Sequence, residues 1–294
     1  MSTLDGQVAI VTGGGKGLGR AFAIHLAELG AAVVVNNRNR VVDADGRSAA
    51  DYVVDEIVAA GGRAVANYGD VSDPATADAL VAAALDTWGR LDICVTSAAI
   101  SGPQMFHSTT ADNFAHVMAI NVTGTALVTA ASMKVMREAG RGRIIMIAST
   151  AGLHGEPTVS AYAASKGAII ALARTAAAEG ARRGVLTNVL LPYATTQMTE
   201  EGMDPRFAEA MRAELVAPVV GALADPTSTI NGQVIVAAGS GMRVADSVEG
   251  GTVMLTDSLT PDDLQSLIDK SRAGSPHTYE HALEAFKDFA SELV

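Results

Sequence analysis

Short runs of Val, Ile and Ala alternate with longer segments of helical periodicity from about residue 7 to residue 237, and this alternation restricts the fold more than any other feature. Several of the runs are apolar throughout, as expected of strands that are covered on both faces. Strands that alternate with helical crossovers form a parallel sheet with helices on either side. The sequence therefore predicts an α/β fold with a doubly wound, seven-stranded parallel sheet.

The pattern also places the individual elements and one boundary. We predict strands at residues 8–12, 32–36, 63–67, 91–96, 142–148, 185–190 and 233–236, and helices at 17–29, 51–60 and 111–138. Residues 38–46 read as a polar surface loop. One domain is expected over residues 1–239. Residues 240–294 form a helical C-terminal extension that packs on the core or on a partner subunit, with helices at 261–271 and 277–293, the first capped by Thr260 or Asp262.

Composition limits the class of protein. A net charge of −11 over 294 residues argues against nucleic acid as a partner, because binding phosphates needs a basic surface. The single cysteine, Cys94, excludes an intrachain disulfide framework and is compatible with a reducing compartment. We see no signal-peptide pattern and no apolar run of membrane-spanning length. These observations predict a cytoplasmic protein that binds neither nucleic acid nor membrane, and we expect no metal.

Residues 12–19 read Thr-Gly-Gly-Gly-Lys-Gly-Leu-Gly and lie between the first predicted strand and the first helix. A glycine-rich turn lets the backbone approach a pyrophosphate, and the helix N-terminus behind it offers free N–H groups and a positive dipole end. This placement predicts a dinucleotide site and a Rossmann-type sheet; a tight structural turn, the alternative, does not require three consecutive glycines. The candidate binding residues are Thr12, Gly13, Gly15, Lys16, Gly17, Leu18 and Gly19.

The end of the second strand bears on the choice of cofactor. An acidic residue there normally binds the adenosine ribose and repels a 2′-phosphate, but this chain has Asn37 and Arg38. Arg38 can pair with phosphate and Lys16 adds a second cation, which favours NADP(H). In the alternative, Arg38 begins a solvated loop and NAD(H) binds through the Asn37 amide. Asp70 follows the third strand and is placed to meet the adenine edge, to cap the helix that starts near Pro74, or to do both.

A second group of residues indicates proton transfer. Ser149 follows the fifth strand, and Tyr162 and Lys166 lie four apart at the start of a helix, on one face. A phenol is a poor base at neutral pH, but a neighbouring ammonium group and a nicotinamide cation stabilise its phenolate. Ser149 would hydrogen-bond the substrate oxygen. The set predicts an oxidoreductase that interconverts a secondary alcohol and a ketone with Tyr162 as general acid/base.

Together these motifs resemble those of the short-chain dehydrogenase/reductase superfamily over residues 6–239. The resemblance implies that Gly13, Gly17 and Gly19 are cofactor glycines and that Asp70 is the adenine-side aspartate. It implies that Asn121 holds a proton-relay water through a local helix distortion, and that Lys166 also binds the nicotinamide ribose. The implied catalytic tetrad is Asn121, Ser149, Tyr162 and Lys166.

The chain departs from the family at two places. The Asn-Asn-Ala-Gly after the fourth strand is Thr-Ser-Ala-Ala at residues 96–99, and the Pro-Gly after the sixth is Pro192-Tyr193. Gln197 stands where a threonine often contacts the cofactor. By position, the remaining cofactor contacts are Val71, Ala98, Ala99, Pro192, Ala194 and Gln197, and the candidate substrate contacts are His154, Tyr193 and Met198.

Four longer stretches, residues 33–36, 61–68, 142–146 and 216–218, are similar to the hydroxyacyl-CoA dehydrogenase part of peroxisomal multifunctional enzymes and their bacterial relatives. This resemblance implies a 3-hydroxyacyl-CoA or a steroid or lipid degradation intermediate as substrate, and a homodimer or homotetramer. In that group the residue at Asn37 is typically aspartate and the cofactor NAD. The alternatives are a reductase of free ketones and a non-catalytic dinucleotide-binding regulator; the complete tetrad argues against the regulator. An epimerase on the same scaffold is a further alternative, but extended epimerases carry a larger C-terminal substrate domain than residues 240–294 provide.

Overall fold

The computed structural model describes residues 3–38, 42–195, 205–256 and 258–293. It divides the chain into two compact units, Met1–Val244 and Ala245–Val294, which are described separately below.

The first unit is built on an eight-stranded sheet with the order β3-β2-β1-β4-β5-β6-β7-β8. The strands are β1 (Val8–Thr12), β2 (Ala32–Asn36), β3 (Arg63–Asn67), β4 (Ile93–Thr96), β5 (Gly142–Ile147), β6 (Val185–Pro192), β7 (Val234–Ala238) and β8 (Gly241–Val244). The first seven pair in parallel, as predicted. The order changes direction at β1, between β2 and β4, which is where doubly wound sheets place their ligands.

The predicted strand count was one too low. The chain reverses after β7 and adds β8 as an antiparallel edge strand, with Ala238 opposite Gly241. Gly239, in the turn between them, has a φ of +52°, and a Cβ there would lie 2.5 Å from the Ala210 oxygen. Every residue of β8 is exposed, so this strand lacks the apolar run by which the others were predicted.

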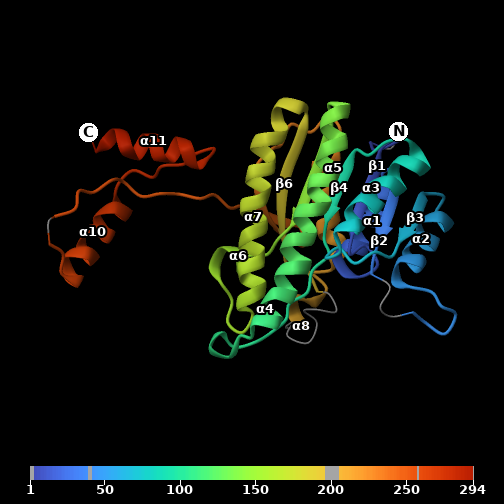
Figure 1. Ribbon diagram of the computed structural model, residues 1–294, viewed down its shortest axis with the longest axis horizontal. Coiled ribbons are helices and arrows are strands. Elements are labelled where there is room, and N and C mark those ends of the chain that lie inside the picture. Colours follow the sequence, from blue (N-terminus) through green and yellow to red (C-terminus); the bar gives the residue numbers. More distant parts are fainter. Residues whose placement is uncertain (1–2, 39–41, 196–204, 257, 294) are drawn as a thin grey trace. The chain divides into compact units, whose positions relative to one another are not determined.

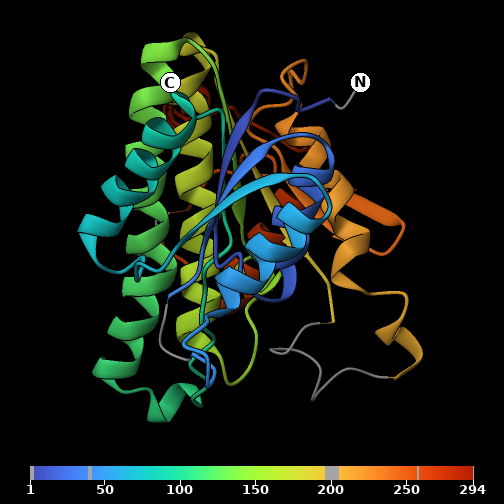
Figure 2. The same cartoon turned by 90° about the vertical axis from the view of Figure 1, so that its right-hand side faces the viewer.

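Helices cover both faces of the sheet (Figures 1 and 2). One layer contains α1 (Gly17–Glu28), α2 (Ala49–Ala59) and α9 (Ala217–Ala224), and the other contains α3 (Pro74–Trp88), α5 (Thr125–Ala139) and α7 (Ser160–Gly180). The shorter helices of this unit are η1 (Phe106–Ser108), α4 (Ala111–Met118), α6 (Ala151–His154), η3 (Ala181–Arg183), α8 (Pro205–Ala208) and η5 (Ala213–Val216).

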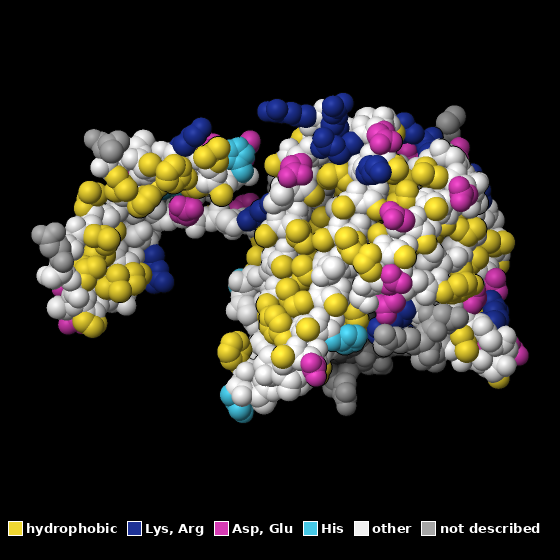
Figure 3. All heavy atoms as spheres, in the orientation of Figure 1, with side chains coloured by type: hydrophobic (Ala, Val, Ile, Leu, Met, Phe, Trp, Pro, Cys, Tyr) yellow, Lys and Arg dark blue, Asp and Glu magenta, His cyan; other side chains and the backbone are white. Residues whose placement is uncertain are grey.

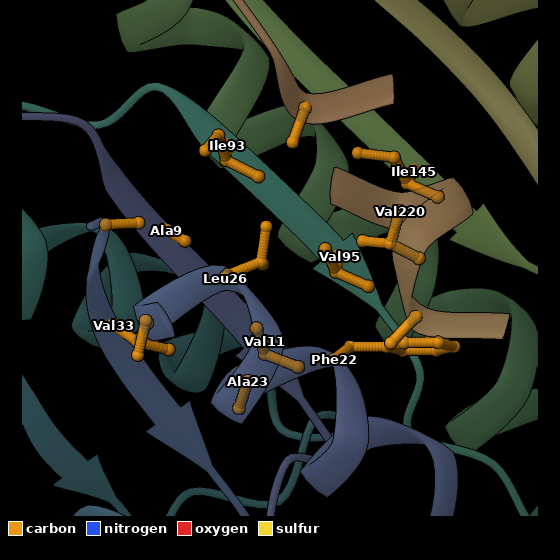
Figure 4. Packing of buried hydrophobic residues seen from close by; sticks show 14 of the residues in the cluster. Ala9, Val11, Phe22, Ala23, Leu26, Val33, Ile93, Val95, Ile145 and Val220 are labelled. Carbon is orange, nitrogen blue, oxygen red and sulfur yellow. The ribbon is translucent and has the colours of Figure 1, made fainter. Parts of the chain in front are cut away.

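The core beneath the first layer holds α1 against the sheet (Figure 4). Phe22 and Leu26 lie one turn apart on α1 and are fully buried, and they belong to one cluster with Val95, Ile145 and Val220. Burial of each such side chain contributes about 1.5–3 kcal/mol to folding. The N-terminus of α1, which follows the glycine turn, is therefore held in a fixed place at the sheet edge.

The long helix over residues 111–139 is continuous but irregular. Its middle, Ala119–Gly124, winds as a π-helix between α4 and α5. By length and mean hydropathy alone, 1.4 over its most apolar window, this helix meets the requirement for crossing a membrane, so the prediction that no apolar run has this length was wrong. In the structure 39% of that window is buried, and α5 contacts β4, β5, α3 and α7 as part of the second helix layer.

The second unit contains α10 (Pro261–Ala273) and α11 (Ala282–Glu292). Thr260 caps α10, as predicted, and shares a capping box with Asp263: each side chain accepts a hydrogen bond from the other residue's backbone N–H. The second helix begins later than predicted. Residues 277–281 instead include a bridge between His277 and Glu249, and His281 caps α11.

Candidate active site

The glycine turn closes on its own backbone and on the loop after β4. Gly13 has a φ of +65°, and a Cβ on it would lie 2.9 Å from the backbone of Ala98. A Cβ on Gly19 would lie 2.2 Å from the Gly13 oxygen, and one on Gly15 would lie 2.9 Å from Asn37. Glycine is therefore required at each of these positions, and the turn leaves its backbone N–H groups close to the start of α1.

Thr12 joins the ends of β1 and β4. Its hydroxyl accepts hydrogen bonds from the N–H groups of Ser97 (3.1 Å) and Ala98 (3.2 Å), so the loop that replaces the family's Asn-Asn-Ala-Gly is tied to the glycine turn. Lys16 is the N-cap of α1 and its side chain makes no capping bond. The first-turn N–H groups of α1 consequently lack a side-chain cap, and these groups with the exposed Lys16 fit a pyrophosphate.

Arg38 and Asp70 meet at the ends of β2 and β3. The Arg38 Nη1 lies 3.5 Å from the Asp70 carboxylate, and both side chains are partly exposed. The Asp70 carboxylate also accepts from the hydroxyl (2.7 Å) and the N–H (3.1 Å) of Ser72. Asp70 does not cap the following helix; Asp73 does, by accepting from the Ala75 N–H.

The charge on Asp70 is favoured by these contacts. Burial acts to raise its pKa, but the Ser72 hydrogen bonds and the nearby Arg38 guanidinium outweigh it, so the pKa lies below its ordinary value. Asp70 is an anion at neutral pH that can accept from an adenine amino group, and Arg38 is a cation held beside it.

The ends of β4 and β5 and the start of α7 bring the candidate proton-transfer residues together. Ser149 follows β5, and its side chain lies near enough to the phenol of Tyr162 to act on the pKa of that group. The Lys166 ammonium lies 5.4 Å from the centre of the Tyr162 ring. A Cβ on Gly152 would lie 2.5 Å from the backbone of Lys166 and Gly167, so the turn after Ser149 packs directly on α7.

Burial dominates the electrostatics of the pair. Lys166 is 3% exposed and donates to the Ile147 oxygen at 2.8 Å, and desolvation lowers its pKa to about 8. Burial also raises the pKa of Tyr162, and the Ser149 side chain offsets this only in part. In the protein alone the ammonium is directed to the Ile147 carbonyl, and the stabilisation of the phenolate by Lys166 together with a nicotinamide cation stays a prediction.

Asn121 lies on the π-helix and is fully buried. Its side-chain oxygen accepts from the Ile100 N–H, and its amino group donates to the Ile100 oxygen and to the Ser165 hydroxyl, each at 2.9 Å. The helix distortion that the resemblance implied is thus present at this residue. Its side chain is bonded to the loop after β4 and to α7.

The remaining predicted residues lie at the same edge of the sheet or outside the described chain. Val71 is buried against Gly124, whose added Cβ would lie 2.8 Å from it, and Ala99 is partly buried beside Ala98. Ala194 packs with Ala21, and Leu18 lies against them. Pro192 ends β6, Tyr193 is 46% exposed, and His154 is exposed at the end of α6. Gln197 and Met198 lie outside the described residues.

Sequence reasoning missed Ser165. This residue is fully buried. Its hydroxyl donates to the backbone oxygen of Tyr162 at 2.7 Å and accepts from the side-chain amino group of Asn121. Its spacing of three from Tyr162 places both on one side of a helix, which was the available signal. The partnership with Asn121 joins residues 44 apart in the sequence, and spacing alone does not predict it.

Residues 7–206 match the family model described as short chain dehydrogenase. Among curated relatives, a peroxisomal multifunctional enzyme type 2 of Drosophila melanogaster is 39% identical over 257 residues, which is 87% of this chain and 42% of that protein. A 3-oxoacyl-[acyl-carrier-protein] reductase of Synechocystis is 39% identical over 201 residues, 68% of this chain and 79% of that protein. The chain therefore spans about two fifths of the multifunctional relative.

A solved structure extends the likeness over nearly the whole chain. A short chain dehydrogenase from Mycobacterium avium has a TM-score of 0.81 and 35% sequence identity, and the match covers 95% of this chain and 100% of that one. The likeness thus includes the larger part of the second unit as well as the sheet.

Proposed function

This chain belongs to the short-chain dehydrogenase family of nicotinamide-dependent oxidoreductases, and from that premise we propose that it interconverts a secondary alcohol and a ketone with Tyr162 as general acid/base. The observation that carries the proposal is the meeting of Ser149, Tyr162, Lys166 and Asn121 beside the glycine turn at one edge of the sheet.

Each residue has a distinct task in this proposal. Ser149 donates a hydrogen bond to the substrate oxygen and orients it toward the phenol. Tyr162 takes the hydroxyl proton during oxidation, or gives one during reduction. Lys166 places a cation beside the phenol, and Asn121 fixes the π-helix that lines the proton path. The bound nicotinamide would accept or supply the hydride, and in its oxidised form its positive charge would favour the phenolate.

For the cofactor we propose NADP(H), with NAD(H) as the alternative. Gly13, Gly15 and Gly19 leave room for a dinucleotide backbone to approach, and Lys16 and Arg38 are the cations of that end of the site. Arg38 already faces Asp70, so pairing with a 2′-phosphate requires it to divide its N–H groups between two anions. A guanidinium has five N–H donors, and this arrangement is open to it.

For the substrate we propose a 3-hydroxyacyl-CoA or a steroid or lipid degradation intermediate. Support comes from two relatives, one named as a peroxisomal multifunctional enzyme and one as a 3-oxoacyl-[acyl-carrier-protein] reductase, of which the second name states an acyl substrate. Tyr193, which follows β6, and His154, at the end of α6, are exposed and are the described candidates for substrate contact, and Met198 completes the proposed set. A reductase of free ketones remains the second candidate.

The test is turnover measured at the nicotinamide absorbance band with NADP⁺ and NAD⁺ against 3-hydroxybutanoyl-CoA, a long-chain 3-hydroxyacyl-CoA, a steroid alcohol and 2-octanol. Tyr162→Phe should lower kcat by about a thousandfold or more while cofactor affinity stays within about twofold, because only the acid/base is removed. A near-normal rate in this variant would exclude Tyr162 as the acid/base. Tight cofactor binding without turnover of any compound would favour a non-catalytic regulator.

We further propose that the protein is a homodimer or homotetramer in the cytoplasm. Hydrophobic side chains gather over α5 and α7 on the face shown in Figure 3, and the apolar helix 111–139 is incompletely buried within one chain. Sedimentation tests the assembly, and fractionation of the source cells tests the location.

A further inference from the structure

Ser165 connects three segments that meet beneath the proposed proton-transfer residues. Its hydroxyl is fully buried on α7, 2.9 Å from the Asn121 amino group on the π-helix and 2.7 Å from the Tyr162 backbone oxygen. Through Asn121 it is also linked to Ile100, whose N–H and oxygen both bond the same amide.

The number of hydrogens decides how this network is oriented. A serine hydroxyl has one proton, and here it is donated to the Tyr162 oxygen. Ser165 therefore meets Asn121 as an acceptor, so the Asn121 atom facing it must be the amino group. A flipped amide would place its oxygen against two acceptors, the Ser165 hydroxyl and the Ile100 oxygen, and its amino group against the Ile100 N–H.

The same bond holds the first turn of α7. The Tyr162 carbonyl is the helical acceptor for the Lys166 N–H, one turn later, and the Ser165 hydroxyl binds this carbonyl as well. The Ser165 side chain thus bonds the turn that carries Tyr162 and Lys166 to the π-helix. Its hydrogen bonds go to Asn121 and to the Tyr162 backbone, and the Lys166 ammonium donates to Ile147.

We infer that Ser165 is a positioning residue of the active site, which fixes the amide of Asn121 and the Tyr162–Lys166 turn in one arrangement. This inference rests on the proposed function. Without the hydroxyl, the buried Asn121 amino group and the Tyr162 oxygen each lose a partner, and the amide loses the contact that sets its orientation. Proton transfer is then impaired, while the cofactor turn on α1 is untouched.

The experiment compares the parent, Ser165→Ala, Ser165→Cys and Thr175→Ala. Thr175 is a matched control, since it lies on α7, donates to the Ala171 oxygen at 3.2 Å and is exposed. The reaction is oxidation of 3-hydroxybutanoyl-CoA, or of 2-octanol if the parent oxidises only free alcohols. We measure kcat, KM for substrate and cofactor, the pH profile of kcat, and the unfolding midpoint of each variant.

Ser165→Ala should lower kcat about tenfold to a hundredfold with KM for the cofactor changed less than about twofold. The pH midpoint of kcat should rise by about half a unit or more, because the loosened turn hinders proton removal from Tyr162 and so raises the pKa of its phenol. Ser165→Cys, with a weak S–H donor of similar size, should lie between the parent and Ser165→Ala, and it serves if the alanine variant does not fold. Thr175→Ala should match the parent.

The outcomes separate the two proposals. If the parent turns over and Tyr162→Phe does not, but Ser165→Ala and Ser165→Cys keep the parent kcat and pH profile, the inference about Ser165 is wrong and the proposed function stands. A lowered unfolding midpoint with unchanged kinetics also overturns it, since the role is then only structural. A parent with no turnover on any substrate overturns the proposed function and this inference together.

Discussion

At the scale of single residues, the site is governed by two buried groups whose charged forms are disfavoured. The Lys166 ammonium lies in a space with one carbonyl partner, Ile147, and the Tyr162 phenol is half-buried beside it. Burial lowers the pKa of Lys166 to about 8 and raises the pKa of Tyr162, so the phenolate that the reaction needs is disfavoured without further charge. In our proposal the cofactor brings that charge, which would couple proton transfer to its presence.

The lowered pKa of Lys166 predicts pH-dependent cofactor binding. An ordinary lysine stays charged to above pH 10, but Lys166 in the free protein loses its proton as the pH rises through about 8. Its attraction for an anionic dinucleotide is then lost, so affinity for NADH should fall between pH 7 and pH 9, as followed by fluorescence titration. Lys166→Arg keeps its charge over this range and should show no such fall. Equal pH profiles for both proteins would contradict the prediction.

The effect of Lys166 on folding has the opposite sign to that of a paired lysine. Its pKa is lower in the folded than in the unfolded chain, so the unfolded chain binds more protons between about pH 8 and the ordinary value of 10.5. The buried charge therefore destabilises the fold below pH 8, and this cost disappears as the pH rises toward 10.5. The cost is consistent with a residue kept for function.

Arg38 determines the preferred cofactor if NADP(H) is correct. Arg38→Ala removes the cation beside the 2′-position, so kcat/KM for NADPH should fall about tenfold or more, with that for NADH changed less than about threefold. The matched control is Arg47→Ala, a cation after the same strand that pairs with Asp55. An unchanged ratio of the two kcat/KM values in Arg38→Ala would place NAD(H) first.

At the scale of elements, periodicity predicted what depends on local pattern. All seven parallel strands were located, three of them with both ends correct, because most of them are buried runs of Val, Ile, Leu and Ala between turn residues. Strand β8 was missed because all of its residues are exposed. The start of α11 was placed too early, and no buried residue marks where this helix begins. Ser149, Tyr162 and Lys166 were predicted from a strand end and from helix spacing, and Asn121 only from the resemblance to the family. The bond from Asn121 to Ser165 depends on how two distant helices pack.

At the amino ends of the strands, away from the proposed active site, a buried carboxylate network should affect stability without affecting catalysis. Asp92, 3% exposed, accepts from the Val8 N–H and from the side chains of Arg90 and Arg141, and so joins the starts of β1, β4 and β5. Asp92→Asn should lower the free energy of unfolding by about 2–3 kcal/mol, because a buried carboxylate with charged partners is replaced by a neutral amide.

Urea denaturation at one protein concentration measures this change, and kcat should stay within about twofold because the residue lies at the far ends of the strands from Tyr162. Asp55→Asn is the control, an exposed carboxylate paired with Arg47, for which a change within about 0.5 kcal/mol is expected. A loss of similar size in both variants would show that the network at Asp92 contributes no more than a surface pair.

At the scale of the whole molecule, the two units differ in how they use apolar residues. The first unit buries them between the sheet and the helices on its two faces, whereas no residue of α10 or α11 is buried. Helix α11 exposes Leu283, Phe286 and Phe289, which recur at helical spacing on one face. Exposed apolar stripes of this kind mark interaction surfaces in soluble proteins, and for this unit we expect the second copy of the chain to cover it.

Substitution of α11 tests that expectation directly. Phe286→Ser with Phe289→Ser removes the two largest side chains of the stripe, so subunit association should weaken by about tenfold or more. Analytical ultracentrifugation over a range of concentrations measures it, with Lys287→Ser as the control on the same helix. Because these residues are exposed within the second unit, the unfolding midpoint at low concentration should change little. An unchanged association constant in the double variant would mean that the oligomer forms elsewhere, with the apolar helices α5 and α7 as the next surface to substitute.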